Sequence, residues 1–318
     1  MQALITGAGG FVGGHLCEYL LKHTDWDLIG TVFDPAQEAE PSDPRLNLLS
    51  LDLREKDAVH SLVADAQPDY VFHLAAQSSV PAAFADPWDT LENNIQSQLN
   101  LLEATRATGH DVTFLVVGSN EEYGAPRPGE LPQTEQSPLR PTNPYAVSKI
   151  AQDFLGLQYH LAHGVPVVRV RPFNHTGPGQ SPRFVVPAFA SQIARIEAGL
   201  QEPVMRVGNL STSRDFTDVR DVVRAYHLAV TKGEPGEVYN LASGKAHSIE
   251  GVLDTLLSHA QVDIRVERDP NRYRPVDVPV VYGSAEKFYD RTGWRPRVRF
   301  EETLRDTLAY WREQIQST

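Results

Sequence analysis

Short apolar runs alternate with longer amphipathic runs over the first half of the chain. The apolar runs lie at 3–6, 27–33, 47–52, 69–75, 113–119 and 165–171, and the amphipathic runs lie at 11–23, 58–66, 88–109 and 145–164. Strands separated by helices predict βαβ crossovers and a parallel sheet with helices on both faces. The strands are almost continuously apolar, as expected for strands buried on both faces. The pattern therefore predicts a doubly wound α/β fold.

The rhythm changes after Arg171. A turn-rich stretch, "PFNHTGPGQSP", precedes a helix near 184–199, a strand at 204–208 and an amphipathic C-terminal run at 300–314, while 236–243 has the pattern of another sheet strand. A chain of 318 residues is longer than a typical domain of about 100–200 residues. We expect a sheet domain over 1–172, to which 218–243 returns, and a smaller discontinuous C-terminal lobe made of 173–217 and 244–318.

The amino-acid composition argues against several classes of function. The chain is 41% hydrophobic with a formal net charge of -12, which opposes nonspecific binding to nucleic acid. No apolar run approaches the roughly 20 residues that span a bilayer. A predicted apolar strand starts almost directly after Met1, so we expect no cleavable signal peptide before it. Cys17 is the single cysteine, which excludes an intrachain disulfide or thiolate cluster. We expect a cytoplasmic protein without a metal site and without nucleic-acid or membrane partners.

The segment "TGAGGFVG" joins the first predicted strand to the first predicted helix. Its glycines Gly7, Gly10 and Gly13 are spaced three apart. Glycine lets the backbone turn tightly and approach a pyrophosphate at the helix N-terminus, where free N–H groups and the helix dipole favour anions. The alternative is a tight strand-to-helix turn with no ligand. Its place at the start of a βαβ array favours dinucleotide binding.

The residue at the end of the second predicted strand indicates which of the two nicotinamide cofactors is bound. An acidic residue there holds the adenosine ribose hydroxyls, whereas Lys or Arg holds a ribose phosphate. Asp34 stands at this position, and the chain has no Lys or Arg from Thr31 to Pro44. The alternative for Asp34 is a solvated turn residue before Pro35. The pattern favours NAD(H) over NADP(H).

The segment "NPYAVSK" predicts a helix start. Asn143 is a good N-cap and Pro144 suits the first helical position, so Tyr145 and Lys149 fall on one face, one turn apart. Alone they could be a surface pair. Making tyrosinate accessible near pH 7 requires about 4 kcal/mol, and a lysine about 4 Å away at an effective dielectric of 20 supplies a similar amount. Ser119, in "GSNEEYG", can hydrogen-bond the same substrate oxygen.

Four motifs together carry a family resemblance. "TGAGGFVG", "HLAA", "GSNEEYG" and "NPYAVSK" resemble the extended short-chain dehydrogenase/reductase family acting on nucleotide sugars, and the resemblance covers essentially the whole chain. It implies a parallel Rossmann sheet, a smaller substrate lobe and a homodimer formed through a four-helix bundle.

The resemblance also implies roles for individual residues. The catalytic positions fall on Ser119, Tyr145 and Lys149, and Glu121 stands where dehydratases of the family have a base. The cofactor contacts fall on Gly7, Gly10, Phe11, Val12, Gly13, Asp34, Asp52, Leu53, Leu74, Ala75, Ala76, Tyr145, Lys149 and Pro172. The substrate contacts fall on Ser119, Glu121, Asn174, Arg183, Val207, Arg214, Arg274 and Asp277. Arginine suits phosphate because its planar fork holds two oxygens at once.

Several of these residues have structural alternatives. Arg214 could form only an intrachain ion pair with Asp215 or Asp218, and Asn174 and His175 could cap a turn. Glu121 and Glu122 could be solvated. Asn120 departs from the serine, threonine or aspartate expected beside Ser119 in the family, which weakens an assignment of proton transfers beyond carbonyl reduction.

Three activities follow from the resemblance. "RPFNHTGPGQ", "VGNLSTSRDFTDVRDVV" and "YRPVDVP" are most similar to members that reduce a GDP-linked 4-keto-6-deoxyhexose. This similarity implies hydride transfer from NAD(P)H to the 4-keto group of GDP-4-keto-6-deoxy-D-mannose, giving GDP-D-rhamnose. The alternative is a GDP-mannose 4,6-dehydratase, with Glu121 removing a proton at carbon 5, or another nucleotide-sugar epimerase or dehydratase. A noncatalytic dinucleotide sensor is disfavoured, because it would not need Ser119, Tyr145 and Lys149.

Overall fold

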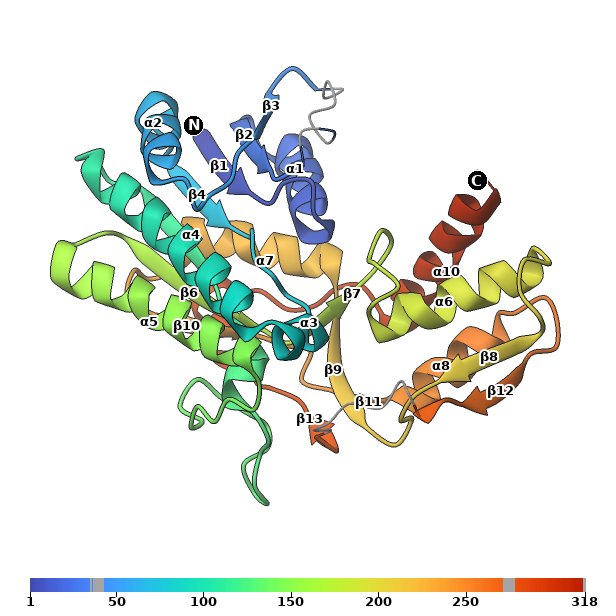
Figure 1. Ribbon diagram of the computed structural model, residues 1–318. Coiled ribbons are helices and arrows are strands. Elements are labelled where there is room, and N and C mark those ends of the chain that lie inside the picture. The colour runs from blue at the N-terminus through green and yellow to red at the C-terminus, as the bar shows by residue number, and fades with distance from the viewer. Residues whose placement is uncertain (35, 37–42, 271–277, 317–318) are drawn as a thin grey trace.

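A parallel sheet forms the centre of the protein. The structure is a computed structural model that describes residues 1–34, 36, 43–270 and 278–316. Within these residues, seven strands form the main sheet in the order β10-β6-β5-β4-β1-β2-β3, with every neighbouring pair parallel (Figure 1). The strands are β1 (Gln2–Thr6), β2 (Asp27–Val32), β3 (Leu46–Ser50), β4 (Tyr70–His73), β5 (Thr113–Val117), β6 (Val167–Pro172) and β10 (Val238–Leu241). The strand order reverses between β1 and β4, which confirms the predicted doubly wound fold.

Helices cover both faces of this sheet. α1 (Phe11–His23) and α7 (Val219–Lys232) pack together on one face, and α2 (Lys56–Ala66), α4 (Pro87–Ala107) and α5 (Pro144–His163) cover the other. Leu4 and Ile5, adjacent in β1, lie in the hydrophobic clusters of opposite faces, and neither is exposed. Burial on both faces explains why the strand sequences are continuously apolar.

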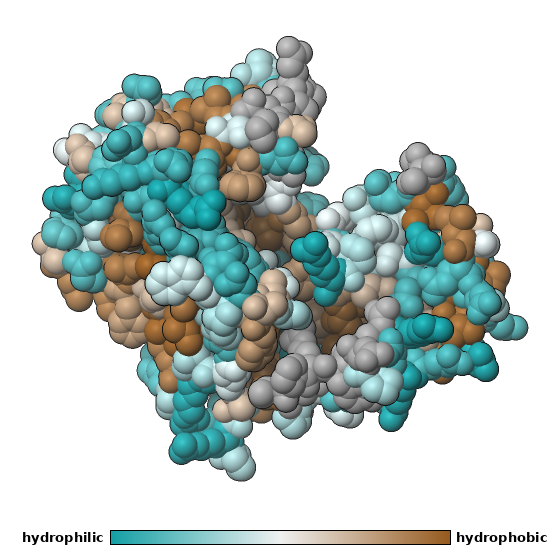
Figure 2. Space-filling model, in the orientation of Figure 1, coloured by the Kyte–Doolittle hydropathy of each residue, from teal (hydrophilic) through white to brown (hydrophobic). Residues whose placement is uncertain are grey.

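The second lobe is built on a smaller sheet and a third hydrophobic cluster. β9 (Ser213–Asp218) pairs with β7 (Asn174–Thr176), β11 (Ala246–Ser248) and β13 (Val280–Val281), while β8 (Val204–Val207) pairs with β12 (Arg265–Arg268). α6 (Val185–Glu197), α8 (Ile249–Ser258) and α10 (Phe300–Gln316) pack around the third cluster. The surface is hollowed between the two lobes (Figure 2).

The chain passes between the two lobes more than once. β9 continues directly into α7, so the chain passes from the small sheet to a helix of the main sheet and then to β10. α9 (Glu286–Thr292) packs against β10 and α7. The run at 214–230 is therefore a strand followed by a helix. None of the helices described is both long enough and apolar enough to cross a membrane.

Candidate active site

The glycine turn brings the backbone close to its neighbours. Gly7 has φ +71°, and a Cβ added there would lie 3.0 Å from the Cα of Ala75. A Cβ added at Gly13 would lie 2.1 Å from the carbonyl oxygen of Gly7. The N-cap of α1 is Gly10, which has no side-chain oxygen to occupy the N–H groups of the first turn. The turn is thus a close-packed cradle open to an anion, as dinucleotide binding requires.

Thr6 ties the end of β1 to the segment that follows β4. Its Oγ1 accepts hydrogen bonds from the N–H groups of Leu74 (3.1 Å) and Ala75 (3.2 Å) and lies 2.9 Å from Nδ1 of His73. Burial lowers the pKa of His73 to about 3, so the imidazole is neutral. The structure therefore brings Gly7, Leu74 and Ala75 together, as the cofactor prediction requires.

Two of the other expected cofactor contacts, Asp52 and Asp34, have hydrogen-bond partners within the protein. The carboxylate of Asp52 pairs with Arg54 at 2.7 Å, which holds the pKa of Asp52 below its usual value, and Leu53 is buried. Asp34 is exposed, and its Oδ1 accepts the N–H of Ala36 at 2.9 Å. This is the hydrogen bond of an Asx turn, which the turn interpretation of Asp34 also predicts.

Asn143 caps α5 and orients the catalytic turn. Its Oδ1 accepts the N–H of Ala146 at 2.8 Å, and its Nδ2 donates to Oε2 of Glu121 at 2.9 Å. Pro144 is the first helical residue, so the predicted helix start is confirmed. Glu121 belongs to the short helix η2 (Asn120–Tyr123), which follows β5 and Ser119. One amide thus sets both the beginning of α5 and the position of Glu121.

Ser119, Tyr145 and Lys149 meet at the carboxyl end of β5. Burial raises the pKa of Tyr145, while a hydrogen bond with Ser119 lowers it by less. Lys149 is buried, its Nζ donates to the carbonyl oxygen of Val117 at 2.9 Å and lies 5.8 Å from the centre of the Tyr145 ring. Burial lowers the pKa of Lys149 to about 8. The site therefore holds a protonated phenol beside an ammonium, and burial raises the pKa of Tyr145 where the sequence predicts that lysine lowers it.

The residues after β6 connect the catalytic end of the sheet to the glycine turn. The ring of His175 stacks on Phe11 with ring centres 6.4 Å apart, and Nε2 of His15 lies 2.8 Å from the carbonyl oxygen of Pro178. Within the described residues, the buried Oδ1 of Asn174 has no hydrogen-bond partner. A buried acceptor without a donor is costly, and a ligand donor would satisfy it.

Arg214 extends from β9, next to β7. Its Nη1 donates to the carbonyl oxygens of Ser213 (2.9 Å) and Val278 (2.7 Å). The carboxylate of Asp215 accepts from Ser243, Gly244 and Gly283, and that of Asp218 pairs with Arg220 and Thr303. These hydrogen bonds do not match the alternative in which Arg214 serves only to pair with one of the two aspartates.

Comparison with known proteins gives one consistent result. The family profile described as GDP-mannose 4,6 dehydratase matches residues 4–307. The chain is 41% identical to GDP-6-deoxy-D-mannose reductase of Pseudomonas aeruginosa, covering 99% of this chain and 98% of that protein. It is 31% identical to GDP-mannose 4,6 dehydratase 2 of Arabidopsis thaliana, covering 95% and 84% respectively. The solved structure of RMD from Pseudomonas aeruginosa complexed with NADPH has a TM-score of 0.87 and 40% identity, covering 98% of this chain and 99% of that one.

The chain belongs to the GDP-mannose 4,6 dehydratase family. The resemblance to nucleotide-sugar enzymes of the extended short-chain dehydrogenase/reductase type is thereby confirmed.

The remaining substrate residues expected from the family differ in their placement. Arg183 is exposed in the loop before α6. The Val207 side chain is only 1% exposed in the third hydrophobic cluster, and its carbonyl oxygen accepts the N–H of Asp269 at 2.8 Å. Its side chain therefore serves the core, and the expected substrate contact of Val207 stays a prediction. Arg274 and Asp277 lie outside the described residues. Pro172 is buried at the end of β6.

The structure contradicts the solvated alternative for Glu122. Its side chain is completely buried behind Ser119. Ser119 and Glu122 form a capping box, in which each side chain accepts the backbone N–H of the other residue. The S-x-x-E spacing in "SNEE" is the sequence signal for this arrangement.

Proposed function

We propose that this protein is a reductase that transfers hydride from NAD(P)H to the 4-keto group of GDP-4-keto-6-deoxy-D-mannose, giving GDP-D-rhamnose. The observation that carries the proposal is the protonated Tyr145 hydroxyl, hydrogen-bonded to Ser119 and faced by Lys149, in a chain 41% identical to GDP-6-deoxy-D-mannose reductase. Carbonyl reduction needs an acid at the oxygen, and a phenol whose pKa is raised is held in its acid form.

The side chains of the site divide the remaining work. Ser119 and Tyr145 hydrogen-bond the carbonyl oxygen, and Tyr145 donates its proton to that oxygen. The Lys149 ammonium, fixed by Val117, stabilises the negative charge that develops on Tyr145. The low-dielectric setting of Lys149 strengthens this interaction because little water screens it.

The cofactor is, on this proposal, a nicotinamide dinucleotide held with its pyrophosphate at the cradle of Gly7, Gly10 and Gly13. When bound, it supplies the hydride. We propose a preference for NAD(H), supported by the exposed Asp34 carboxylate after β2 and by the absence of Lys and Arg from Thr31 to Pro44 in the sequence. The structure of RMD from Pseudomonas aeruginosa contains NADPH. A comparison of kcat/KM for NADH and NADPH tests the preference, and a higher value with NADPH contradicts it.

We also propose which ligand each lobe binds. Residues 1–172 with 218–243 would bind the cofactor, and residues 173–217 with 244–318 would bind the GDP-linked sugar. Support comes from the orphan Oδ1 of Asn174 and from Arg214 and Arg183, whose guanidinium groups suit a pyrophosphate. We place the enzyme in the cytoplasm, where nucleotide and cofactor are available.

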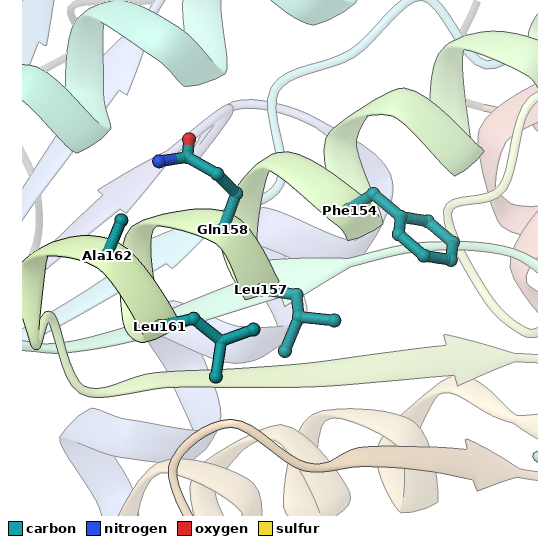
Figure 3. A pocket seen from close by; sticks show the side chains of 5 residues that line it. All are labelled: Phe154, Leu157, Gln158, Leu161 and Ala162. Carbon is teal, nitrogen blue, oxygen red and sulfur yellow. The ribbon is translucent and has the colours of Figure 1, made fainter.

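We further propose a homodimer through the outer face of α4 and α5. Figure 3 shows Phe154, Leu157 and Leu161 projecting from one side of α5, where they line an apolar depression with Gln158 and Ala162. Phe154 is 48% exposed and Leu161 is 74% exposed. Apolar side chains gathered on one helix face of a monomer mark an interaction site. A second copy of α5, with α4 packed beside it, presents the same apolar surface and would form an isologous four-helix contact.

The rival activity is GDP-mannose 4,6-dehydratase. Glu121 supports it, because this half-buried carboxylate is oriented by Asn143 and its charge acts on Tyr145. The deciding experiment offers purified protein GDP-mannose and, separately, its 4-keto-6-deoxy derivative with NADH or NADPH. Loss of reduced cofactor in a one-to-one ratio with the keto sugar supports the reductase. Conversion of GDP-mannose without net cofactor consumption would show the dehydratase instead.

A further inference from the structure

A buried carboxyl lies directly behind the catalytic turn. Glu122 is 0% exposed, and its Oε1 accepts the backbone N–H of Ser119 at 2.7 Å. A Cβ added at Gly118 would lie 2.2 Å from this oxygen. The carboxyl thus packs against backbone that only glycine leaves open, at the point where β5 ends and Ser119 begins.

The other oxygen of Glu122 has an ion-pair partner, Arg171, but no hydrogen-bond donor among the described residues. Oε2 lies 3.0 Å from Nε of Arg171, but the N–H of that nitrogen is directed to Asp153, to which it donates at 2.8 Å. Oε2 therefore receives no hydrogen bond from the described residues. Oδ2 of Asp153 and Oε2 of Glu122 approach the same Nε of Arg171, at 2.8 and 3.0 Å, so the two carboxyl groups are neighbours. A proton on Glu122, donated to Asp153, satisfies Oε2 and removes the repulsion between two buried carboxylates.

The charged groups around Glu122 come from three elements. α5 contributes Asp153, Lys149 and Tyr145, β6 contributes Arg171, and Glu121 is its neighbour in η2. Arg169 lies beyond Asp153, to which it donates at 2.6 Å. Burial, followed by the charge of Asp153, raises the pKa of Glu122 to about 8, against the opposing effect of Arg171. The neutral acid therefore predominates at pH 7.

We propose that Glu122 is a positioning residue which, as a neutral acid, bridges the Ser119 backbone to Asp153 and so holds Ser119 in place beside Tyr145. Asp153 lies on α5, two turns after Tyr145. The bridge therefore links the two elements that carry the acid and its hydrogen-bond partner. The catalytic part of this inference rests on the proposed reduction, whereas the protonation of Glu122 does not.

Two variants test the bridge. In Glu122→Gln the amide oxygen can accept from Ser119 and the amide N–H can donate to Asp153, so this variant should rescue kcat at pH 7 to within about threefold of the wild type. Glu122→Met keeps a similar side-chain length but leaves the Ser119 N–H unpaired, and we expect kcat to fall about tenfold or more while KM changes little. A merely structural role would not separate Gln from Met in this way.

Infrared spectroscopy supplies a readout that needs no substrate. Wild-type protein at pH 7 should show the carbonyl stretch of a protonated carboxylic acid that disappears in Glu122→Gln and is lost in the wild type as the pH rises through about 8. Absence of this difference band overturns the protonated bridge, even if Glu122→Met does not fold. An unchanged kcat in folded Glu122→Met overturns the positioning role. Failure of the wild type to reduce the keto sugar would instead refute the proposed function and leave the infrared result standing.

Discussion

Lys149 and Tyr145 face one another from successive turns of α5, with the ammonium nitrogen 5.8 Å from the centre of the phenol ring. The carbonyl oxygen of Val117, 2.9 Å from Nζ, anchors the lysine to the end of β5. A buried cation is thereby held near the group that becomes negative when it gives up its proton. The buried ammonium stabilises the negative charge that develops in the transition state. Burying this charge also lowers the free energy of unfolding of the protein.

Replacing Tyr145 by Phe should remove the acid and leave the cofactor cradle intact. We expect kcat to fall by about 10²–10⁴-fold, the usual contribution of a general acid. The dissociation constant of the reduced cofactor, followed by its fluorescence, should change little. Tyr159→Phe is the matched control on the same helix, because Tyr159 hydrogen-bonds Glu103 and does not reach the site. Wild-type turnover in Tyr145→Phe would remove Tyr145 from the mechanism.

Replacing Lys149 by Met should abolish turnover but stabilise the fold at pH 7. Burial lowers the pKa of Lys149 from 10.5 to about 8, so between these pH values the unfolded chain binds more protons than the folded chain. The stability of the wild type therefore rises with pH across this window, and the full penalty applies below pH 8. We expect Lys149→Met to gain about 1–3 kcal/mol at pH 7, after the loss of the hydrogen bond to Val117.

Urea unfolding at pH 7 and pH 10 measures this effect. The gain should shrink at pH 10, where the lysine of the folded wild type has lost its proton and most of the cost of burying its charge is gone. A variant that is less stable than the wild type at pH 7 contradicts the assignment of burial as the dominant cause.

The main sheet could be predicted because each of its strands has a local signature. Leu4 and Ile5 face opposite hydrophobic clusters, and such burial on both faces produces an apolar run that is visible in the sequence. The strands of the small sheet have no such signature in the sequence. β13 contains only Val280 and Val281, too few residues for a periodicity, and its pairing with β9 joins positions more than 60 residues apart.

The candidate site likewise contains residues that could be predicted from the sequence and residues that could not. Gly7, Gly13, Tyr145 and Lys149 could be predicted because their spacing along one turn or helix is itself the chemical requirement. The capping box of Glu122 has a signal in "SNEE", but the burial of its carboxyl could not be predicted, because it depends on Asp153 and Arg171, 31 and 49 residues further along the chain. The substrate contacts are expected from resemblance alone, because the sequence around a residue such as Val207, whose side chain is buried, does not specify which of its atoms face a ligand.

Gly13 and Gly14 provide a matched pair for testing the cofactor cradle. A Cβ at Gly13 would meet the carbonyl oxygen of Gly7 at 2.1 Å, whereas a Cβ at Gly14 would come no closer than 3.9 Å to Ala8. Gly13→Ala should weaken cofactor binding at least about tenfold and lower stability by about 1–3 kcal/mol. Gly14→Ala should bind normally and gain up to about 1 kcal/mol of helix stability. Calorimetric titration and thermal unfolding measure both, and equal behaviour of the two variants contradicts the cradle.

We expect the Asn174 side chain to contribute to substrate binding but not to the stability of the fold. Its buried Oδ1 lacks a partner among the described residues, so Asn174→Leu removes an unsatisfied acceptor and should leave the free energy of unfolding unchanged or higher. KM for the keto sugar should rise by about 10- to 100-fold. The contrasting variant is Asn240→Leu, which removes the acceptor of the buried Tyr123 hydroxyl hydrogen and one of the two donors to the carbonyl oxygen of Gln133, and it should lose about 1–3 kcal/mol. A large loss of stability in Asn174→Leu would show a structural role instead.

The exposed face of α5 predicts the oligomeric state. The monomer has a mass of 35.3 kDa, and light scattering coupled to size exclusion should give twice this value for the wild type. The double variant Phe154→Glu and Leu161→Glu places carboxylates in the depression of Figure 3 and should yield monomers, because burying unpaired charges is far more costly than losing apolar contact. Leu200→Glu, at a residue 58% exposed after α6, is the control and should remain dimeric. A double variant that stays dimeric would place the interface elsewhere, and a monomeric wild type would refute the dimer itself.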